Sequence, residues 1–272
     1  MSSLLRLSGV LRTLRKPPVH KKITSHFFSP FHTSRQLKLP SSRPYSNYSH
    51  SYDAYARQVS ANNAVLYALM GTNIAIFGYA MYLKQQAMLG FHDPLIRFMQ
   101  RMTLNLTEFR NGDYLSVLTS TFTHVSIGHI FSNMFTLYFL GSFITTAPVI
   151  TPLRLLTIAL GSGLSGSVGY LAQQQYRLSK QQGWNVRDSG RAMGFSGAVM
   201  GISTVAACLA PRAQVAIWGI IPMPLWALVA GYAVYDGYYL NSVDTRIAHA
   251  GHLGGLGFGL VYYFARLRGL RI

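Results

Sequence analysis

The sequence contains little charge, very few acidic residues and almost no cysteine. Only 11% of its 272 residues are charged, less than half of the roughly 25% typical of a soluble globular domain, which argues against an ordinary water-soluble enzyme. The single cysteine, Cys208, excludes an intrachain disulfide and a cysteine-based metal site. The net charge of +17 reflects 24 Lys and Arg against only 7 Asp and Glu. Because no basic face or groove-reading motif accompanies this charge, we expect no nucleic-acid partner.

The basic residues are concentrated at the N-terminus. Residues 1–60 contain ten of the 24 bases and one acid, Asp53, among many Ser, Thr and Pro residues. Leucines recur at helical spacing between Leu4 and Leu14, opposite basic residues, which is typical of a mitochondrial or plastid transit peptide. We therefore predict that residues 1–60 form a targeting presequence and linker, cleaved in part. A disordered basic tail is the alternative, and a secretory signal fits poorly because no sufficiently long apolar run follows the first bases.

After residue 60 the chain is a series of long apolar runs. Each approaches the roughly 20 residues that a helix needs to cross a bilayer core. The six runs cover approximately 62–83, 127–147, 152–174, 193–211, 214–236 and 248–265. We predict an all-α membrane protein in which residues 61–272 form one domain of six transmembrane helices in a lipid bilayer. The amphipathic part of the connection between the first two runs, interrupted by Asp93-Pro94, is expected to lie at the interface; a further spanning helix is the alternative.

Polar residues inside the apolar runs are few, and such residues tend to mark function because they are costly in lipid. They gather at the starts of three runs, as His129 and Asn133 in the second, Ser196 in the fourth, and His249 and His252 in the sixth. In a six-helix chain, these three runs all begin on the same side of the membrane. The sequence therefore predicts that the three polar groups share one depth.

These residue types permit nucleophilic acyl transfer. A serine hydroxyl becomes reactive when a base within hydrogen-bond reach takes its proton, and neutral histidine is the usual base near pH 7. An Asn amide, a His N–H and a backbone N–H at a helix start can stabilise the resulting oxyanion. Small-xxx-small spacing of glycines lets two helices approach closely, and we expect it to bring Ser196 and His252 together. These glycines are Gly197 and Gly201 in the fourth run and Gly251, Gly255 and Gly259 in the sixth.

Three motifs carry a resemblance to a known family. They are Thr123-His124-Val125-Ser126 leading into His129-x-x-x-Asn133, then Gly194-Phe195-Ser196-Gly197, then Gly251-His252-Leu253-Gly254-Gly255. In this order they resemble the rhomboid family of intramembrane serine proteases, and the presequence resembles its mitochondrial branch. The resemblance implies Ser196 as nucleophile and His252 as general base. It implies His129 and Asn133 as the oxyanion-stabilising residues.

The resemblance also implies a catalytic dyad without an acidic third member or a cofactor, and no Asp or Glu lies in the second, fourth or sixth run. The implied reaction is hydrolysis of peptide bonds in or next to transmembrane helices, in a multi-pass protein of the mitochondrial inner membrane. Substrates are expected to reach the site between the second and fifth helices, past Trp218, Met223 and Trp226. Two departures are Gly251 in place of the usual alanine and the absence of the family's Trp-Arg pair from residues 112–115.

Two residues could be mistaken for members of the site. Ser165 lies in a second Gly-x-Ser-Gly segment, but about 20 Å along the third run, so we interpret that segment as helix packing. His249 lies one turn before His252. In the family motif a glycine follows the histidine by three residues, as Gly255 follows His252, whereas the residue three positions after His249 is His252 itself. We expect His249 at the membrane surface.

Other functions are less well supported by the sequence. A metal site of His129, His249 and His252 lacks a nearby acid and a His-Glu-x-x-His motif. A transporter would more often show repeated halves or paired charges in mid-span. A catalytically inactive rhomboid-like protein that binds transmembrane helices is the main alternative, although both Ser196 and His252 are present. The oligomeric state and the side to which the site opens stay undetermined by the sequence.

Overall fold

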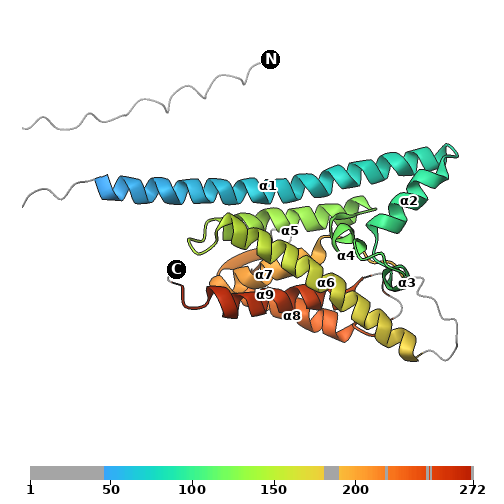
Figure 1. Ribbon diagram of the computed structural model, residues 1–272. Helices are drawn as coiled ribbons and strands as arrows, with labels where there is room; N and C mark the ends of the chain where they lie inside the picture. Colours follow the sequence, from blue (N-terminus) through green and yellow to red (C-terminus); the bar gives the residue numbers. More distant parts are fainter. Residues whose placement is uncertain (1–45, 181–189, 218–219, 243–244, 246, 271–272) are drawn as a thin grey trace, which may run out of the picture. The chain divides into compact units, whose positions relative to one another are not determined.

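The computed structural model describes residues 46–180, 190–217, 220–242, 245 and 247–270 (Figure 1). The first 45 residues of the predicted presequence, and Trp218, lie outside the described residues. Residues 46–60, predicted as part of the linker, are instead the beginning of helix α1 (Ser46–Met88). At 43 residues, α1 is about 65 Å long, roughly twice the thickness of a bilayer core.

Polar side chains in the first half of α1 form hydrogen bonds with a neighbouring turn. This turn, which we call the α5–α6 turn, comprises residues 146–151 between α5 (Ile127–Thr145) and α6 (Pro152–Lys180). Gln58 Nε2 donates to the carbonyl oxygen of Ile150 at 2.7 Å, and Asn62 Nδ2 donates to the same oxygen at 2.8 Å. The Tyr55 hydroxyl donates to the carbonyl oxygen of Thr146 at 2.7 Å. Carbonyl groups after the end of a helix lack donors from within that helix. Here the side chains from α1 provide the missing hydrogen-bond donors.

The connection after α1 contains only short helices. They are α2 (His92–Met102), α3 (Leu106–Arg110), α4 (Ser116–Thr119) and the 3-10 helix η1 (Ser120–Phe122). With 11 residues, α2 is about 16 Å long, half of what a bilayer core requires. A further spanning helix in this connection is therefore ruled out, whereas the interfacial position of the segment stays a prediction.

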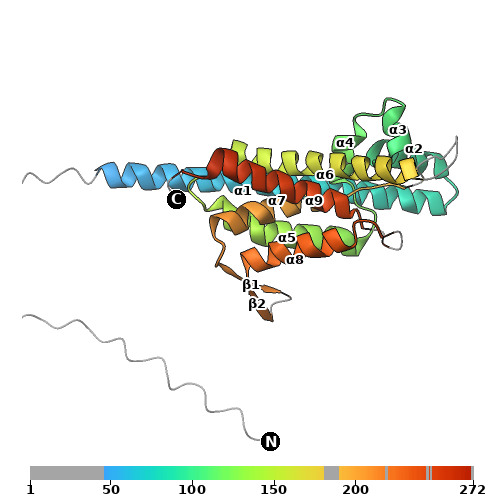
Figure 2. The same cartoon turned by 90° about the horizontal axis from the view of Figure 1, so that it is seen from below.

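Helices α6, α7 (Ser196–Leu209) and α9 (His249–Tyr262) pack side by side (Figures 1 and 2). A Cβ atom added to Gly255 would lie 2.0 Å from the carbonyl oxygen of Gly197, and one on Gly259 would lie 2.5 Å from that of Gly201. Only glycine fits at such distances, which confirms the predicted close approach of the two glycine-containing helices. Helix α9 continues as a π-helical turn, η2 (Tyr263–Leu267).

The fifth apolar run differs from the predicted single helix. Its first half forms an antiparallel hairpin of β1 (Gln214–Ile217) and β2 (Ile221–Pro224), and only its second half is helical, as α8 (Leu225–Tyr238). Pro222 and Pro224 lack the N–H that a helix interior needs. The helix therefore begins after them, and the hairpin projects from the helices in Figure 2.

In the described part of the chain, three helices are long and apolar enough to cross a membrane, namely those spanning Ser51–Met88, Ile127–Thr145 and Pro152–Lys180. Helices α7, α8 and α9 have 14 residues each, or about 21 Å. Phe131, Phe135 and Phe139, one turn apart on α5, are 64%, 51% and 55% exposed, as expected of side chains that face lipid. The protein is an all-α membrane bundle with one small hairpin, and the count of six crossings stays a prediction.

Candidate active site

Ser196 is the first residue of α7 and follows a tightly held loop. Gly194 has a φ of +126°, which L-residues rarely adopt, and its N–H donates to the carbonyl oxygen of Ser120 at 2.9 Å. Ala192, two residues before Gly194, forms two backbone hydrogen bonds with Leu104, at 2.8 and 2.9 Å. The connection between α1 and α5 thus fixes the direction in which the chain enters α7.

The structure brings Ser196 and His252 together, as the sequence predicted. His252 lies in the first turn of α9, and its Nε2 atom is 2.9 Å from Ser196 Oγ. Ser196 is half-buried, and 16% of the His252 side chain is exposed. A hydroxyl and an imidazole in this geometry form the nucleophile–base pair of acyl-transfer enzymes.

An acidic residue that sequence reasoning missed lies on the other side of His252. Asp236, near the end of α8, is 2% exposed, and its two carboxylate oxygens are 3.0 and 3.1 Å from His252 Nδ1. The three motifs lie in the second, fourth and sixth runs, which contain no acid, whereas Asp236 ends the fifth. Its position as the single acid within any of the six runs was the available signal.

His249 does not behave as expected for a residue at the membrane surface. It is 1% exposed, and its Nδ1 atom is 2.6 Å from Asp236 Oδ1. Its Nε2 atom is 2.9 Å from the hydroxyl of Thr245. Both ring nitrogens therefore have polar partners inside the protein, which explains why the ring can be buried.

The two predicted oxyanion residues lie close to the loop that precedes Ser196. A Cβ atom on Gly194 would be 2.5 Å from Cε1 of His129, so the half-buried His129 ring lies directly against this loop. Asn133 is one turn further along α5, and its Nδ2 atom is 3.0 Å from His124 Nε2 and 3.1 Å from the carbonyl oxygen of His129. Both amide hydrogens of Asn133 have partners here, so its oxyanion role stays a prediction that requires one of them to be exchanged.

His124 is a second residue whose role sequence reasoning missed. It is fully buried, and its Nε2 atom accepts from the Phe195 N–H at 3.3 Å in addition to contacting Asn133. Burial, with a smaller effect of the neighbouring His129, lowers the pKa of His124 from 6.5 to about 4. In a neutral ring with its proton on Nδ1, Nε2 is the acceptor that both donors share, and the buried Nδ1 atom has no hydrogen-bond partner among the described residues. His124 therefore links Asn133 to the residue before the nucleophile.

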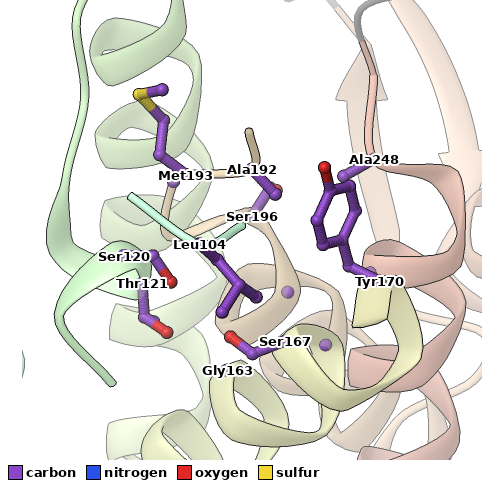
Figure 3. Close-up of a pocket in the computed structure, with 14 residues that line it drawn as sticks. Leu104, Ser120, Thr121, Gly163, Ser167, Tyr170, Ala192, Met193, Ser196 and Ala248 are labelled. Carbon is purple, nitrogen blue, oxygen red and sulfur yellow. The ribbon is translucent and has the colours of Figure 1, made fainter. Parts of the chain in front are cut away.

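A small cavity of about 40 Å³ adjoins Ser196 (Figure 3). Four polar side chains line it together with the backbone around the nucleophile: Ser120, Thr121, Ser167 and Tyr170. Because one water molecule needs roughly 10–15 Å³ of such space, the cavity can admit at least one. The site thus has room for the water that a hydrolytic reaction consumes.

Ser165 occupies a different environment. It lies in the middle of α6, and a Cβ atom on Gly254 would be 2.4 Å from its carbonyl oxygen. This close backbone contact between α6 and α9 supports the packing interpretation of residues 163–166.

The metal alternative has no support in the described ranges, in which no three His, Cys, Asp or Glu side chains are arranged to hold an ion. Instead, the ring nitrogens of His249 and His252 lie within hydrogen-bond distance of Asp236, Thr245 and Ser196.

Comparison with known proteins gives this geometry a family. Residues 111–269 match the Rhomboid domain, and this stretch is more than half of the chain. The protein is therefore a member of the rhomboid family, whose members are generally intramembrane serine proteases. All three motifs that carried the resemblance lie within the matched region.

Relatives in plants, fungi and animals are mitochondrial. The chain is 35% identical over 175 residues to RHOMBOID-like protein 12, mitochondrial, of Arabidopsis thaliana, covering 62% of this chain and 51% of the relative. It is 25% identical over 208 residues to Rhomboid protein 1, mitochondrial, of Saccharomyces cerevisiae, covering 73% and 52%. It is 26% identical over 155 residues to the human Presenilin-associated rhomboid-like protein, mitochondrial, covering 54% and 36%.

The chain spans about half the length of the first two relatives. Together with the apolar helices, these matches make it a mitochondrial membrane protein.

Proposed function

We propose that this protein is an active intramembrane serine endopeptidase of the mitochondrial inner membrane, with Ser196 as nucleophile and His252 as general base. The observation that carries the proposal is the 2.9 Å distance between Ser196 Oγ and His252 Nε2. The substrates are membrane proteins cleaved in or next to a transmembrane helix.

Acylation begins when His252 Nε2 takes the proton of the Ser196 hydroxyl as Oγ attacks the scissile carbonyl carbon. The carbonyl oxygen becomes an oxyanion, for which the N–H groups at the start of α7, His129 and Asn133 are the available donors. The carbon–nitrogen bond then breaks. His252 returns the proton to the departing nitrogen, which leaves as an amine, and Ser196 carries the acyl group as an ester.

Deacylation repeats these steps with water. A water molecule from the cavity next to Ser196 attacks the ester carbon while His252 takes one of its protons. The carbon–oxygen bond to Ser196 breaks, and the proton passes from His252 to Oγ. The second product leaves with a new carboxyl group, and the enzyme regains its starting protonation.

The substrate helix must unwind locally at the cleaved bond, because an intact helix shields the peptide group by its own hydrogen bonds. We expect access from the side of α5 and α8. Trp226, in the first turn of α8, is 57% exposed, and Met223 precedes it in β2. Smaller side chains at these two positions would widen that route.

The mechanism is tested by comparing Ser196→Ala, His252→Ala and Ser165→Ala for cleavage of a transmembrane substrate in liposomes. We expect less than about 0.1% of the activity to remain in the first two variants, since either loss disables the pair. Ser165→Ala, the matched control in the second Gly-x-Ser-Gly segment, should stay within about twofold of the unaltered protein. Normal activity in Ser196→Ala would refute the mechanism, and loss of activity in a folded Ser165→Ala would reassign the nucleophile.

Labelling by a serine-reactive fluorophosphonate separates the protease from the alternative, an inactive rhomboid-like protein that binds transmembrane helices. The protease is expected to be labelled at Ser196. A folded protein that binds a transmembrane helix but is neither labelled nor cleaves it would be the inactive binder.

A further inference from the structure

We infer that Asp236 is a positioning residue that makes the catalytic pair a Ser196–His252–Asp236 triad, and that His249 holds Asp236 in place. The inference rests on the proposed protease function and adds an acidic member to a site that the sequence motifs describe without one. Its basis is a chain of four side-chain contacts that runs from Thr245 to Ser196.

The contacts define one consistent set of donors and acceptors. A carboxylate can only accept hydrogen bonds, so the two imidazoles that contact Asp236, at 2.6 Å from His249 and 3.0 Å from His252, must each carry a proton on Nδ1. Each Nε2 is then an acceptor. That of His249 accepts from the Thr245 hydroxyl at 2.9 Å, and that of His252 accepts from the Ser196 hydroxyl at 2.9 Å.

This set of protons is the one that general-base catalysis by His252 requires. His252 can take the Ser196 proton only when Nε2 is unprotonated, and the Asp236 carboxylate selects that tautomer by holding the proton on Nδ1. Once His252 has accepted the proton, its ring is positively charged. The adjacent carboxylate stabilises that charge in a site where little water screens it, because only 3% of the Asp236 side chain is exposed.

His249 accounts for the presence of a charged group at such depth. A buried carboxylate is costly unless hydrogen bonds satisfy it, and His249 supplies one that does not involve the catalytic pair. The His249 ring is itself enclosed, with Tyr239 stacked at 5.8 Å and Tyr235 edge-on at 5.7 Å between ring centroids. His249 therefore fixes Oδ1 of Asp236, the same oxygen that lies 3.0 Å from His252 Nδ1.

Replacing Asp236 with Asn would preserve its size but break this pattern. Both oxygens of Asp236 lie within 3.1 Å of His252 Nδ1, and Oδ1 also contacts His249; an amide would place a donor NH₂ at one of these two acceptor positions. If the amide NH₂ faced His252, that ring would carry its proton on Nε2 and could not accept from Ser196. In soluble serine proteases the same replacement leaves the geometry intact and lowers kcat about 10⁴-fold through the wrong tautomer.

The test uses the full chain in liposomes and measures kcat and KM separately for a transmembrane substrate. We expect Asp236→Asn to lower kcat on the order of 10³-fold with KM within about threefold, because the substrate does not contact Asp236. Asp236→Glu, which restores a carboxylate, should recover at least about tenfold of that loss. His249→Phe keeps a ring next to Tyr235 and Tyr239 but removes the donor, and should lower kcat about tenfold.

The control is Asp93→Asn, the same chemical change at an exposed acid in the first turn of α2; its kcat should not change. Thermal unfolding of each variant shows whether it is folded. If Asp236→Asn does not fold, Asp236→Glu and His249→Phe decide the question by the same split between kcat and KM.

Two outcomes count against the inference and are distinguishable. A folded Asp236→Asn with kcat within about threefold of the unaltered protein, in a preparation where Ser196→Ala is inactive, overturns the triad and leaves the proposed protease intact. An unaltered protein whose cleavage equals that of Ser196→Ala overturns the proposed function and the triad with it.

Discussion

Residues 163–166 and 194–197 have the same Gly-x-Ser-Gly pattern but occupy different positions relative to their helices. The first segment lies in the middle of α6, where the helix itself satisfies the backbone N–H groups. The second crosses the start of α7, where the Gly194 N–H donates to Ser120 and the Phe195 N–H donates to His124. The position of the helix start therefore decides whether this pattern forms a packing surface or presents a nucleophile.

The two segments also meet. A Cβ atom on Gly166 would lie 3.4 Å from Cα of Gly197 and 2.7 Å from the carbonyl oxygen of Gly251, next to His252. The packing segment thus supports the helix ends that carry the catalytic pair. The three predictions below test how far the difference between the segments depends on the loop before Ser196.

The largest effect is expected from adding a methyl group to the first glycine of each segment. In Gly194→Ala the new Cβ would meet the His129 ring at 2.5 Å while the backbone keeps a φ of +126°. We expect a loss of about 3 kcal/mol of stability and at least about 100-fold in kcat/KM. In Gly163→Ala the nearest atom is the methyl of the buried Thr121, at 2.6 Å, and the backbone stays helical, so the loss of stability should be smaller, about 1–2 kcal/mol.

Unfolding in detergent and cleavage in liposomes measure both variants. Equal losses in the two variants would show that the loop before Ser196 has no special requirement for glycine.

A smaller effect is expected from pH, because only the second segment depends on a neutral histidine. The folded-state pKa of His124, about 4, lies below its unfolded value of 6.5. The unfolded chain therefore takes up a proton first as the pH falls, and stability is lost between pH 6.5 and 4. From pH 7.5 to pH 5 the loss amounts to about 2 kcal/mol.

This loss is measured as the difference in pH dependence of unfolding between the unaltered protein and His124→Gln. The exposed His92→Gln is the control. If both variants keep the full pH dependence, the neutral form of His124 does not stabilise the fold.

The smallest effect is expected from the ion pair outside the loop. Arg191, three residues before Gly194, contacts the Glu108 carboxylate with both of its terminal nitrogens and donates to the Thr103 hydroxyl at 2.9 Å. The side chains of Arg191 and Glu108 are 31% and 28% exposed, so Arg191→Ala should lower the stability of the fold by about 0.5–1 kcal/mol.

The matched control is the exposed Arg212→Ala, after α7. A thermal unfolding midpoint lowered by a few degrees relative to that control would agree with the prediction. An identical midpoint would show that the ion pair does not stabilise the loop.

The positions of the helices were predictable because apolar length and Pro or Gly boundaries are local properties of the sequence. The six runs each contain a helix, and the close approach of α7 and α9 followed from the spacing of glycines such as Gly197 and Gly255. The hairpin of β1 and β2 was missed because hydropathy does not distinguish strand from helix in an apolar run. Pro222 and Pro224 were the signal that could have corrected it.

The proximity of Ser196 and His252 was predictable from motifs, but the surroundings of this proposed catalytic pair were not. Asp236 and His124 act through contacts with residues 16 and 71 positions away, and no local pattern specifies such contacts. The start of α1 was missed for the same reason. Tyr55 and Gln58 look like linker residues until the α5–α6 turn supplies acceptors for them.

Those acceptors set a physical limit on maturation. Removing the N-terminal segment up to residue 60 would take away Tyr55 and Gln58, and with them the donors to the carbonyl oxygens of Thr146 and Pro148. Removal that stops before residue 51 would leave these hydrogen bonds in place. The predicted targeting presequence and the helix that contacts the α5–α6 turn are therefore adjacent in the chain. Cleavage between them preserves the hydrogen bonds to the α5–α6 turn only if the cleaved bond lies on the N-terminal side of Tyr55.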